Sequence, residues 1–375
     1  MDFFYGKIEE MLIFIYNENR LESKFKEKVI PPYIIQDGRH EMKRLVKILF
    51  ALLLLVGCSS KSDEDNLDAV DPNTFESEEN PVLQSTALFG HNFISQINGE
   101  KAEFDYNGSP IEIPYRLESG EDNEKDFTVG FDVYIDGIPQ KYSVIKTNCG
   151  NEDEKLDKSY MHQFTMAKGE VCDFSFVLDP NVGKKGEVLG LYIGTVFNPD
   201  YISTKENPAF GNYHKVFFGA GTPITYHEDV SDVKKMNANT QEAMEEGKEN
   251  GNGETELNNM DSLLLFIVDP QTEEVASTIN AKDGVVPIKF TVQGGPTAKY
   301  RLYCKLNNEH VAIDSYENID LHIEQNKRFT YEGEIKIPDN IKLASLEVIA
   351  IPYGDSYSGD FVFVEQSNAV LVVNK

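Results

Sequence analysis

The chain has 375 residues and carries 63 Asp and Glu against 35 Lys and Arg, which gives a formal net charge of −28 at pH 7. So strong an acidic balance argues against binding to nucleic-acid phosphates and against docking on anionic lipid through a basic patch. The length allows two domains of ordinary size with linkers between them.

A short apolar run lies close to the start of the chain. Met42-Lys43-Arg44 precedes uninterrupted apolar residues from Ile48 to Val56, and small Gly57 and Cys58 follow. The run is about half as long as a membrane-spanning helix needs to be. A basic start, a short apolar core and a small residue before the cleavage site are typical of an export signal that is removed. The alternative is a buried core helix with a chance cysteine.

The residues Leu55-Val56-Gly57-Cys58 resemble the lipobox of bacterial lipoproteins. The resemblance implies that a signal peptide of residues 42–57 is cleaved and that Cys58 becomes a lipidated N-terminus with fatty acyl chains such as palmitate. Two or three acyl chains hold a protein stably on a membrane. We therefore expect a protein anchored outside the cytoplasm, in the cell membrane or the outer membrane. Residues 1–41 are then interpreted as a mis-assigned leader, with translation starting at Met42.

Residues 58–83 are rich in Ser, Asp, Glu, Asn and Pro, a composition that predicts a flexible acidic tether. The opening from Ser59 to Asp65 resembles the acidic patch that marks surface-exposed lipoproteins of the Bacteroidetes group. Gram-positive lipoproteins carry similar tethers, so the kind of membrane stays open.

Strand-like patterns then dominate the chain. Apolar residues alternate from Phe127 to Ile135, Asp136-Gly137 supplies a two-residue turn, and Ile138 to Ile145 returns as the second strand of a hairpin. Further strand-like runs follow, and none shows an apolar helical period of comparable strength. The predicted fold class is all-β.

Residues 229–260 interrupt this pattern with charged residues and an Asn-Gly repeat, and we interpret them as an acidic linker. A short polar helix from Thr240 to Glu246 is one option there. The linker divides a first domain, residues 84–228, from a second domain, residues 261–375.

The second domain repeats the plan of the first. The matched pairs are Phe93-Ile94 with Phe266-Ile267, Ile111–Tyr115 with Val286–Phe290, the hairpin at Asp136-Gly137 with the one at Asn307-Asn308, Phe164-Thr165 with Phe329-Thr330, and Leu189–Ile193 with Leu346–Ala350. Tandem copies with about seven short strands each resemble immunoglobulin-like antiparallel β-sandwiches. A single larger β domain is the alternative.

The cysteines after Cys58 suit an exported protein. Cys149 and Cys172 flank the acidic segment that follows the first hairpin, and a disulfide between them would tie it down. Spacing alone does not set their geometry, so the pairing stays open. Cys304 shares a strand face with Leu302 and Leu306, which predicts a small buried hydrophobic residue.

Sequence motifs for catalysis are missing. The chain has no GxSxG elbow, no Walker sequence and no Cys-x-x-Cys, and its histidines show no HxxxH spacing. Gly219-Ala220-Gly221 follows an apolar strand but lacks the third glycine and the helix of a phosphate-binding loop. We therefore expect no enzyme activity, no metal site and no cofactor besides the lipid on Cys58.

Binding has weak support from tyrosines. The chain has no Trp, the residue that stacks best on sugars, but Tyr201, Tyr353 and Tyr357 lie in loops that could present aromatic rings. Packing on strand edges is the competing interpretation of these rings. The expected function is a non-catalytic module for interaction, adhesion or spacing that contacts an envelope protein or an extracellular ligand. The alternative is a lipoprotein that captures carbohydrate for an uptake or degradation system.

Overall fold

The computed structural model describes residues 89–120, 126–149, 154–202, 217–243, 245–246, 263–325, 327–338, 340–358 and 363–374. The predicted signal peptide, the lipobox from Leu55 to Cys58 and the tether lie outside these residues. All described residues belong to one structural unit, Glu78–Lys375. No helix among them is long and apolar enough to cross a bilayer.

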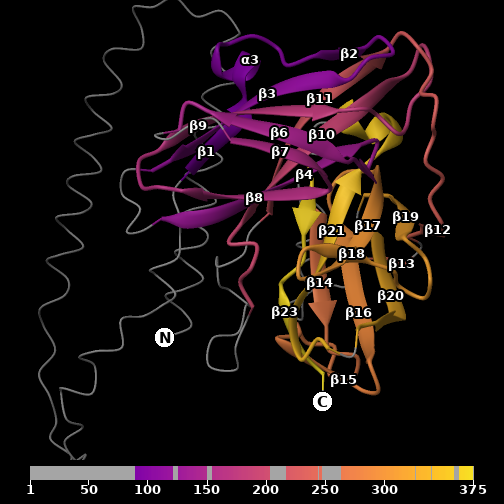
Figure 1. The fold of residues 1–375 in the computed structure, drawn as a ribbon. Coiled ribbons are helices and arrows are strands. Elements are labelled where there is room, and N and C mark those ends of the chain that lie inside the picture. Colours follow the sequence, from indigo (N-terminus) through magenta and orange to yellow (C-terminus); the bar gives the residue numbers. More distant parts are fainter. Residues whose placement is uncertain are drawn as a thin grey trace, which may run out of the picture. The chain divides into compact units, whose positions relative to one another are not determined.

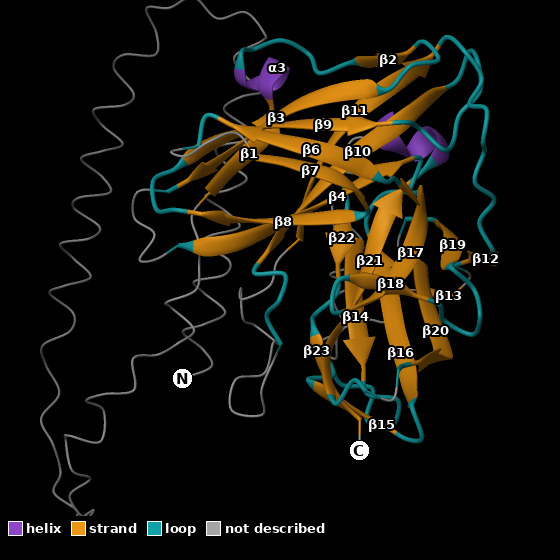
Figure 2. Cartoon of the chain, viewed as in Figure 1, coloured by secondary structure: helices purple, strands orange, loops and turns teal. Residues whose placement is uncertain are grey.

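Strands make up nearly all of the regular structure, as Figure 2 shows. The first half forms two packed sheets, one with the strand order β1-β3-β9-β6-β7 and one with the order β2-β11-β10-β4-β5, in which β8 also pairs with β4. Its elements are β1 (Phe89–Phe93), α3 (Ile94–Ile97), β2 (Phe104–Tyr106), β3 (Ile111–Ser119), β4 (Phe127–Ile135), β5 (Ile138–Pro139), β6 (Tyr142–Thr147), β7 (Glu154–Ser159), β8 (Met161–Met166), β9 (Val171–Leu178), β10 (Val188–Phe197) and β11 (Phe217–Tyr226).

The second half forms another pair of sheets (Figure 1). One has the order β12-β19-β17-β21-β23-β15, with β18 on β17 and β22 on β21, and the other has the order β13-β20-β16-β14. The elements are β12 (Ala238–Glu242), β13 (Glu245–Glu246), β14 (Leu263–Val268), β15 (Thr278–Ala281), β16 (Val285–Gly294), β17 (Ala298–Leu306), β18 (Glu309–Val311), β19 (Asn318–Ile323), β20 (Lys327–Lys336), β21 (Leu343–Pro352), η3 (Gly354–Ser358), β22 (Glu365–Gln366) and β23 (Val370–Asn374).

The first two strands of each half are arranged in the same way. The first strand, β1 or β14, joins one sheet, and the short strand after it, β2 or β15, crosses to the other sheet and pairs in parallel with the last strand, β11 or β23. Most other pairs are antiparallel, as expected for sandwiches of this kind. The prediction of an all-β chain with tandem immunoglobulin-like sandwiches is confirmed.

The two predicted hairpin turns are equivalent in the structure. Asp136 and Gly137 have φ of 50° and 72°, and Asn307 and Asn308 have φ of 49° and 71°. Two successive residues with positive φ form the turn whose twist matches that of the flanking strands, and Asp, Asn and Gly tolerate this backbone best. The turns connect β4 to β5 and β17 to β18.

Each sandwich has its own apolar core. In the first, Phe131 lies at the centre of an aromatic cluster, with ring centroids 4.8 Å from Phe174 and 5.2 Å from Phe176. In the second, Cys304 is 3% exposed between Leu302 and Leu306, and burial raises the pKa of its thiol to about 12. Cys304 is therefore a buried hydrophobic residue, as predicted.

Two sequence interpretations differ from the structure. The predicted linker contains β12 and β13, which pair with β19 and β20, and the helix option from Thr240 is wrong. The polar side chains of β12 and β13 do not prevent strand pairing, because the pairing uses backbone groups. Ala243, which follows β12, lies in the core of the second sandwich. Phe164 lies in β8 and pairs with β4, whereas Phe329 lies in β20 and pairs with β16, so these two positions are not equivalent.

Candidate functional site

The turn between β4 and β5 is held by residues of the second sandwich. Tyr303 Oη donates a 2.6 Å hydrogen bond to the carbonyl oxygen of Gly137, and the N–H of Gly354 donates one of 2.6 Å to Asp136 Oδ1. The guanidinium of Arg301 donates to the carbonyl oxygen of Asp136 and stacks on the Tyr353 ring, 4.4 Å from its centroid. The tip of one sandwich is thus fixed on the strands of the other.

A buried ion pair lies beside this turn. The ammonium of Lys305, on β17, binds the carboxylate of Asp132, on β4. Ions are costly to bury, so such a pair persists only where the geometry is well satisfied. Nearby, Asn308 Nδ2 donates a 2.7 Å hydrogen bond to the carbonyl oxygen of Pro199.

Apolar and aromatic side chains surround these polar contacts. Tyr134 Oη lies 3.1 Å from His310 Nε2, and the His310 ring stacks on Tyr303 at 4.7 Å between centroids. The outer faces of the sheets that hold β4 and β21 therefore pack together. The buried members of this cluster are Tyr134, Tyr192, Val196, Phe217, Tyr303, Ile349 and Ile351.

A cavity of about 660 Å³ opens at the β11 end of this contact. The first sandwich contributes β10, β11 and Glu103, and the second contributes Tyr357 of η3 and the two residues before β22, Phe363 and Val364. Its lining comprises Glu103, Val188, Tyr192, Gly219, Gly221, Thr222, Pro223, Thr225, Tyr357, Phe363 and Val364. We call it the β11 cavity. It is a composite site, because neither sandwich supplies all of its walls.

Two glycines let the walls approach β11. A Cβ at Gly221 would lie 2.7 Å from the Tyr192 ring, and one at Gly219 would lie 2.8 Å from Val364. Contacts that short do not occur in real side chains, so only glycine permits this packing. The close packing of Val364 and Tyr192 on β11 therefore depends on Gly219 and Gly221.

The Tyr192 side chain lines the same cavity, and its hydroxyl is buried. The residue is 5% exposed, and its hydroxyl has no hydrogen-bond partner among the described residues. Burial raises the pKa of this phenol far above its usual value, so it stays a neutral donor. A buried hydroxyl without a partner costs free energy of folding.

A second cavity of about 500 Å³ lies at the other end of the contact, near β8 and β18. Tyr160 is 44% exposed there, with the Lys141 and Lys234 ammonium groups 5.2 Å and 6.0 Å from its ring centroid. His310 and Asn308 contribute from the second sandwich. The ammonium groups of these two lysines already contact the Tyr160 ring. The Tyr160 ring is therefore less available for stacking on a ligand than the rings of the β11 cavity.

The tyrosines named from the sequence fall in different settings. Tyr357 lines the β11 cavity. Tyr353 carries Arg301 on its ring and helps to hold the two sandwiches together. Tyr201 follows β10, where its N–H donates a 2.9 Å hydrogen bond to the carbonyl oxygen of Asn198. Tyr201 and Tyr353 are not among the residues that line the β11 cavity.

Sequence reasoning missed most of the β11 cavity. In the sequence, Tyr192 is one more residue of a strand-like apolar run. Gly219 and Gly221 were considered only as part of a phosphate-binding loop. Glycines at alternate positions of an edge strand next to an aromatic-rich strand were the signal available in the sequence.

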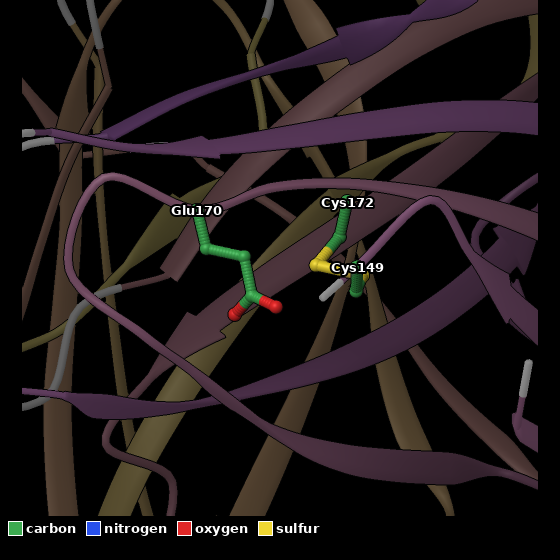
Figure 3. Close-up of side chains that lie close together, drawn as sticks. All are labelled: Cys149, Glu170 and Cys172. Carbon is green, nitrogen blue, oxygen red and sulfur yellow. A yellow bond between two sulfur atoms is a disulfide. The ribbon is translucent and has the colours of Figure 1, made fainter. Parts of the chain in front are cut away.

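Cys149 and Cys172 form a disulfide that joins the end of β6 to β9. The Glu170 carboxylate lies beside them, as Figure 3 shows, with one donor atom of each residue within 4.8 Å of the others. Disulfide sulfurs are not the thiolates that metals bind. Glu170 instead accepts a 2.7 Å hydrogen bond from the N–H of Ala167, so this group stabilises a turn.

No family model matches the sequence, and no curated protein matches it. Solved structures show a distant likeness. A red sea bream transglutaminase matches at 6% identity and a TM-score of 0.19, over 77% of this chain and 31% of that one, so the chain spans about a third of that protein.

Two further solved structures match over most of their own length. The calcium binding domain CBD12 of CALX1.1 matches at 11% identity and a TM-score of 0.18, over 70% of this chain and 81% of that one. The E. coli chaperone DraB matches at 9% identity and a TM-score of 0.21, over 76% of this chain and 98% of that one. These likenesses concern the sandwich fold alone.

Proposed function

We propose that the protein is a non-catalytic interaction module, anchored outside the cytoplasm by lipid on Cys58, that binds an envelope protein or an extracellular ligand. The lipobox sequence supports the anchoring, and the immunoglobulin-like sandwiches are consistent with a binding role. The observation that carries the proposal is the β11 cavity, which both sandwiches line and which their buried contact holds in one geometry. A preformed concave surface with aromatic walls suits binding.

Anchoring is tested by Cys58→Ala. The parent protein should take up a palmitate analogue and fractionate with membranes, whereas the variant should do neither. A Ser59→Ala variant is the matched control, because it changes a neighbouring residue and keeps the sulfur. An unlabelled parent protein, or a labelled Cys58→Ala variant, would refute the anchor.

The interaction role is tested by cross-linking the anchored protein on its own cells, followed by mass spectrometry. We expect a defined envelope protein or complex, with cross-linked positions that cluster on one face. Cross-links spread evenly over abundant proteins would count against the role.

Carbohydrate is the second candidate ligand, because the Tyr357 and Phe363 side chains line the β11 cavity. Aromatic rings with hydroxyl and carboxylate groups nearby suit a sugar, whose faces are apolar and whose edges are polar. This function predicts saturable binding to one class of glycan on an array, and loss of that binding in Tyr357→Ala. It would make the protein a capture component for an uptake or degradation system.

A further inference from the structure

We infer that the outer edge of β11 binds an extended peptide of a partner protein by strand addition, with a side chain of that peptide in the β11 cavity. This inference rests on the proposed interaction role and specifies the class of ligand and the way it docks.

The edge of β11 is only partly paired. On one side β11 pairs with β10 along nearly its whole length. On the other side, among the described residues, β2 pairs with Ile224, Thr225 and Tyr226 alone. Just before β2, Ala102 contacts Thr222, whose hydroxyl donates a hydrogen bond to the Ala102 carbonyl oxygen. On this edge, no strand in the described part of the chain pairs with the stretch from Gly219 to Gly221.

The register shows which backbone groups face this edge. The N–H of Tyr226 bonds to Glu187 on the β10 side, and the N–H of Phe217 bonds to the Gln366 side chain on the opposite side. Backbone groups alternate between the two sides along a strand. The N–H and C=O groups of Gly219 and Gly221 therefore point away from β10, toward the unpaired edge. A peptide strand placed there would find donors and acceptors at the spacing it needs.

Two other edges in the described part of the sandwiches are protected. Asn368 closes the edge of β14, donating to and accepting from the backbone of Ile267. The edge strand β7 carries charged side chains, including Lys155 and Lys158. Such devices prevent unwanted strand pairing. The stretch Gly219-Ala220-Gly221 carries no charge, and both of its glycines are exposed.

The β11 cavity lies on one face of this edge. A Cβ at Gly219 or Gly221 would point toward Val364 and Tyr192, so the cavity lies over the face to which these glycines belong. Side chains of an added strand alternate between its two faces. Every second side chain would therefore enter the cavity, where Val188, Phe363 and Val364 offer apolar contacts to it.

The negative charge of this protein restricts the class of peptide that can bind. Glu103 lines the cavity and is exposed, and the chain as a whole carries −28. An acidic peptide would be repelled. The preferred ligand is thus an extended peptide with an apolar anchor and a Lys or Arg on the Glu103 side.

Peptides selected from a displayed random library against the full-length protein test this inference. The selected peptides should share an apolar residue with a basic neighbour, and on binding they should protect the amides of Gly219 and Gly221 from hydrogen exchange. Phe363→Ala should weaken binding by about tenfold or more, as expected for an anchor contact. Phe218→Ala is the matched control, because Phe218 is similarly exposed, at 40% against 42%, and belongs to the opposite face of β11.

N-methylation of the peptide gives a test that does not depend on folding of variants. Strand addition predicts that methylation of every second backbone nitrogen abolishes binding and that methylation of the intervening ones is tolerated. Equal effects at all positions, exchange protection elsewhere, or unaltered binding by Phe363→Ala would overturn the inference, as would binding of a glycan in place of any peptide. If the cross-linking on cells still finds a partner at another face, the strand-addition inference fails while the proposed interaction role stands.

Discussion

The ammonium of Lys305 and the carboxylate of Asp132 form an ion pair between the two sandwiches, with both side chains almost fully buried, at 2% and 7% exposure. One residue comes from β17 and the other from β4, so the pair exists only when the sandwiches are docked. Buried tyrosine and isoleucine side chains belong to the same contact. The tandem sandwiches thus behave as one unit in the described part of the chain, and the composite β11 cavity follows from this docking.

Lys305→Met should destabilise the protein by about 3–5 kcal/mol, because Asp132 would stay buried without its ammonium partner. The double variant Lys305→Met with Asp132→Leu should recover most of that loss, since the Asp132 carboxylate is then no longer buried without its ammonium partner. Urea unfolding measures both free energies. If the double variant is no more stable than the single one, the pair is not the source of the loss.

Gly137→Ala should be costly for two reasons. The residue has φ of +72°, and an added Cβ would lie 3.0 Å from Arg301 Cδ of the second sandwich. Gly186→Ala separates these effects, because Gly186 has φ of +87° and nothing within 4 Å of its Cβ position. We expect about 1 kcal/mol for Gly186→Ala from backbone strain alone, and a larger loss for Gly137→Ala. Equal losses in thermal unfolding would show that Arg301 adapts freely.

Glu365 should make stability depend on pH. Burial raises the pKa of its carboxyl from 4.5 to about 7, so the folded protein holds a proton that the unfolded chain has released. The stability that this group contributes is therefore present below pH 4.5 and is lost as the pH rises toward 7. Glu365→Gln should match the parent protein near pH 4 and exceed it by about 1–2 kcal/mol at pH 8, a value reduced for partial exposure. A constant difference between the two proteins across this range would contradict the raised pKa.

The disulfide between Cys149 and Cys172 closes a loop with a sequence separation of 23. Replacing both cysteines by serine should cost about 3 kcal/mol, mainly because the unfolded chain becomes less constrained. Treating the parent protein with a reductant should lower its stability in the same way and should not affect the double variant. Cys304→Ala serves as the control, because its thiol is buried in the second sandwich and forms no disulfide. A reductant effect that persists in the double variant would place the cause elsewhere.

Local pattern was enough to predict the fold class, and it was not enough to predict the site. The hairpin at Asp136-Gly137 could be predicted because strand alternation and the demand for positive φ are properties of adjacent residues. The sequence did not predict β12. Its pairing with β19 is parallel, so no hairpin turn marks it, and its side chains are mostly polar, so apolar residues do not alternate along it.

The β11 cavity has a different reason for being missed. Its walls extend in sequence from Glu103 to Val364, and only the docking of two sandwiches brings them together. Tyr357 was singled out for its aromatic ring, and the sequence could not distinguish it from Tyr353, which packs under Arg301. Long-range packing decides which of two similar loop tyrosines faces a cavity, and no local rule reports it.

Tyr192 and Tyr303 form the sharpest matched pair, because both are buried in the contact between the sandwiches and differ in what their hydroxyls do. Tyr303 Oη donates to Gly137, whereas the Tyr192 hydroxyl has no hydrogen-bond partner among the described residues. Tyr303→Phe should therefore cost about 1–2 kcal/mol, and Tyr192→Phe should leave stability unchanged or raise it by up to about 1 kcal/mol. Chemical denaturation measures both. A loss of stability in Tyr192→Phe as large as that in Tyr303→Phe would contradict this prediction.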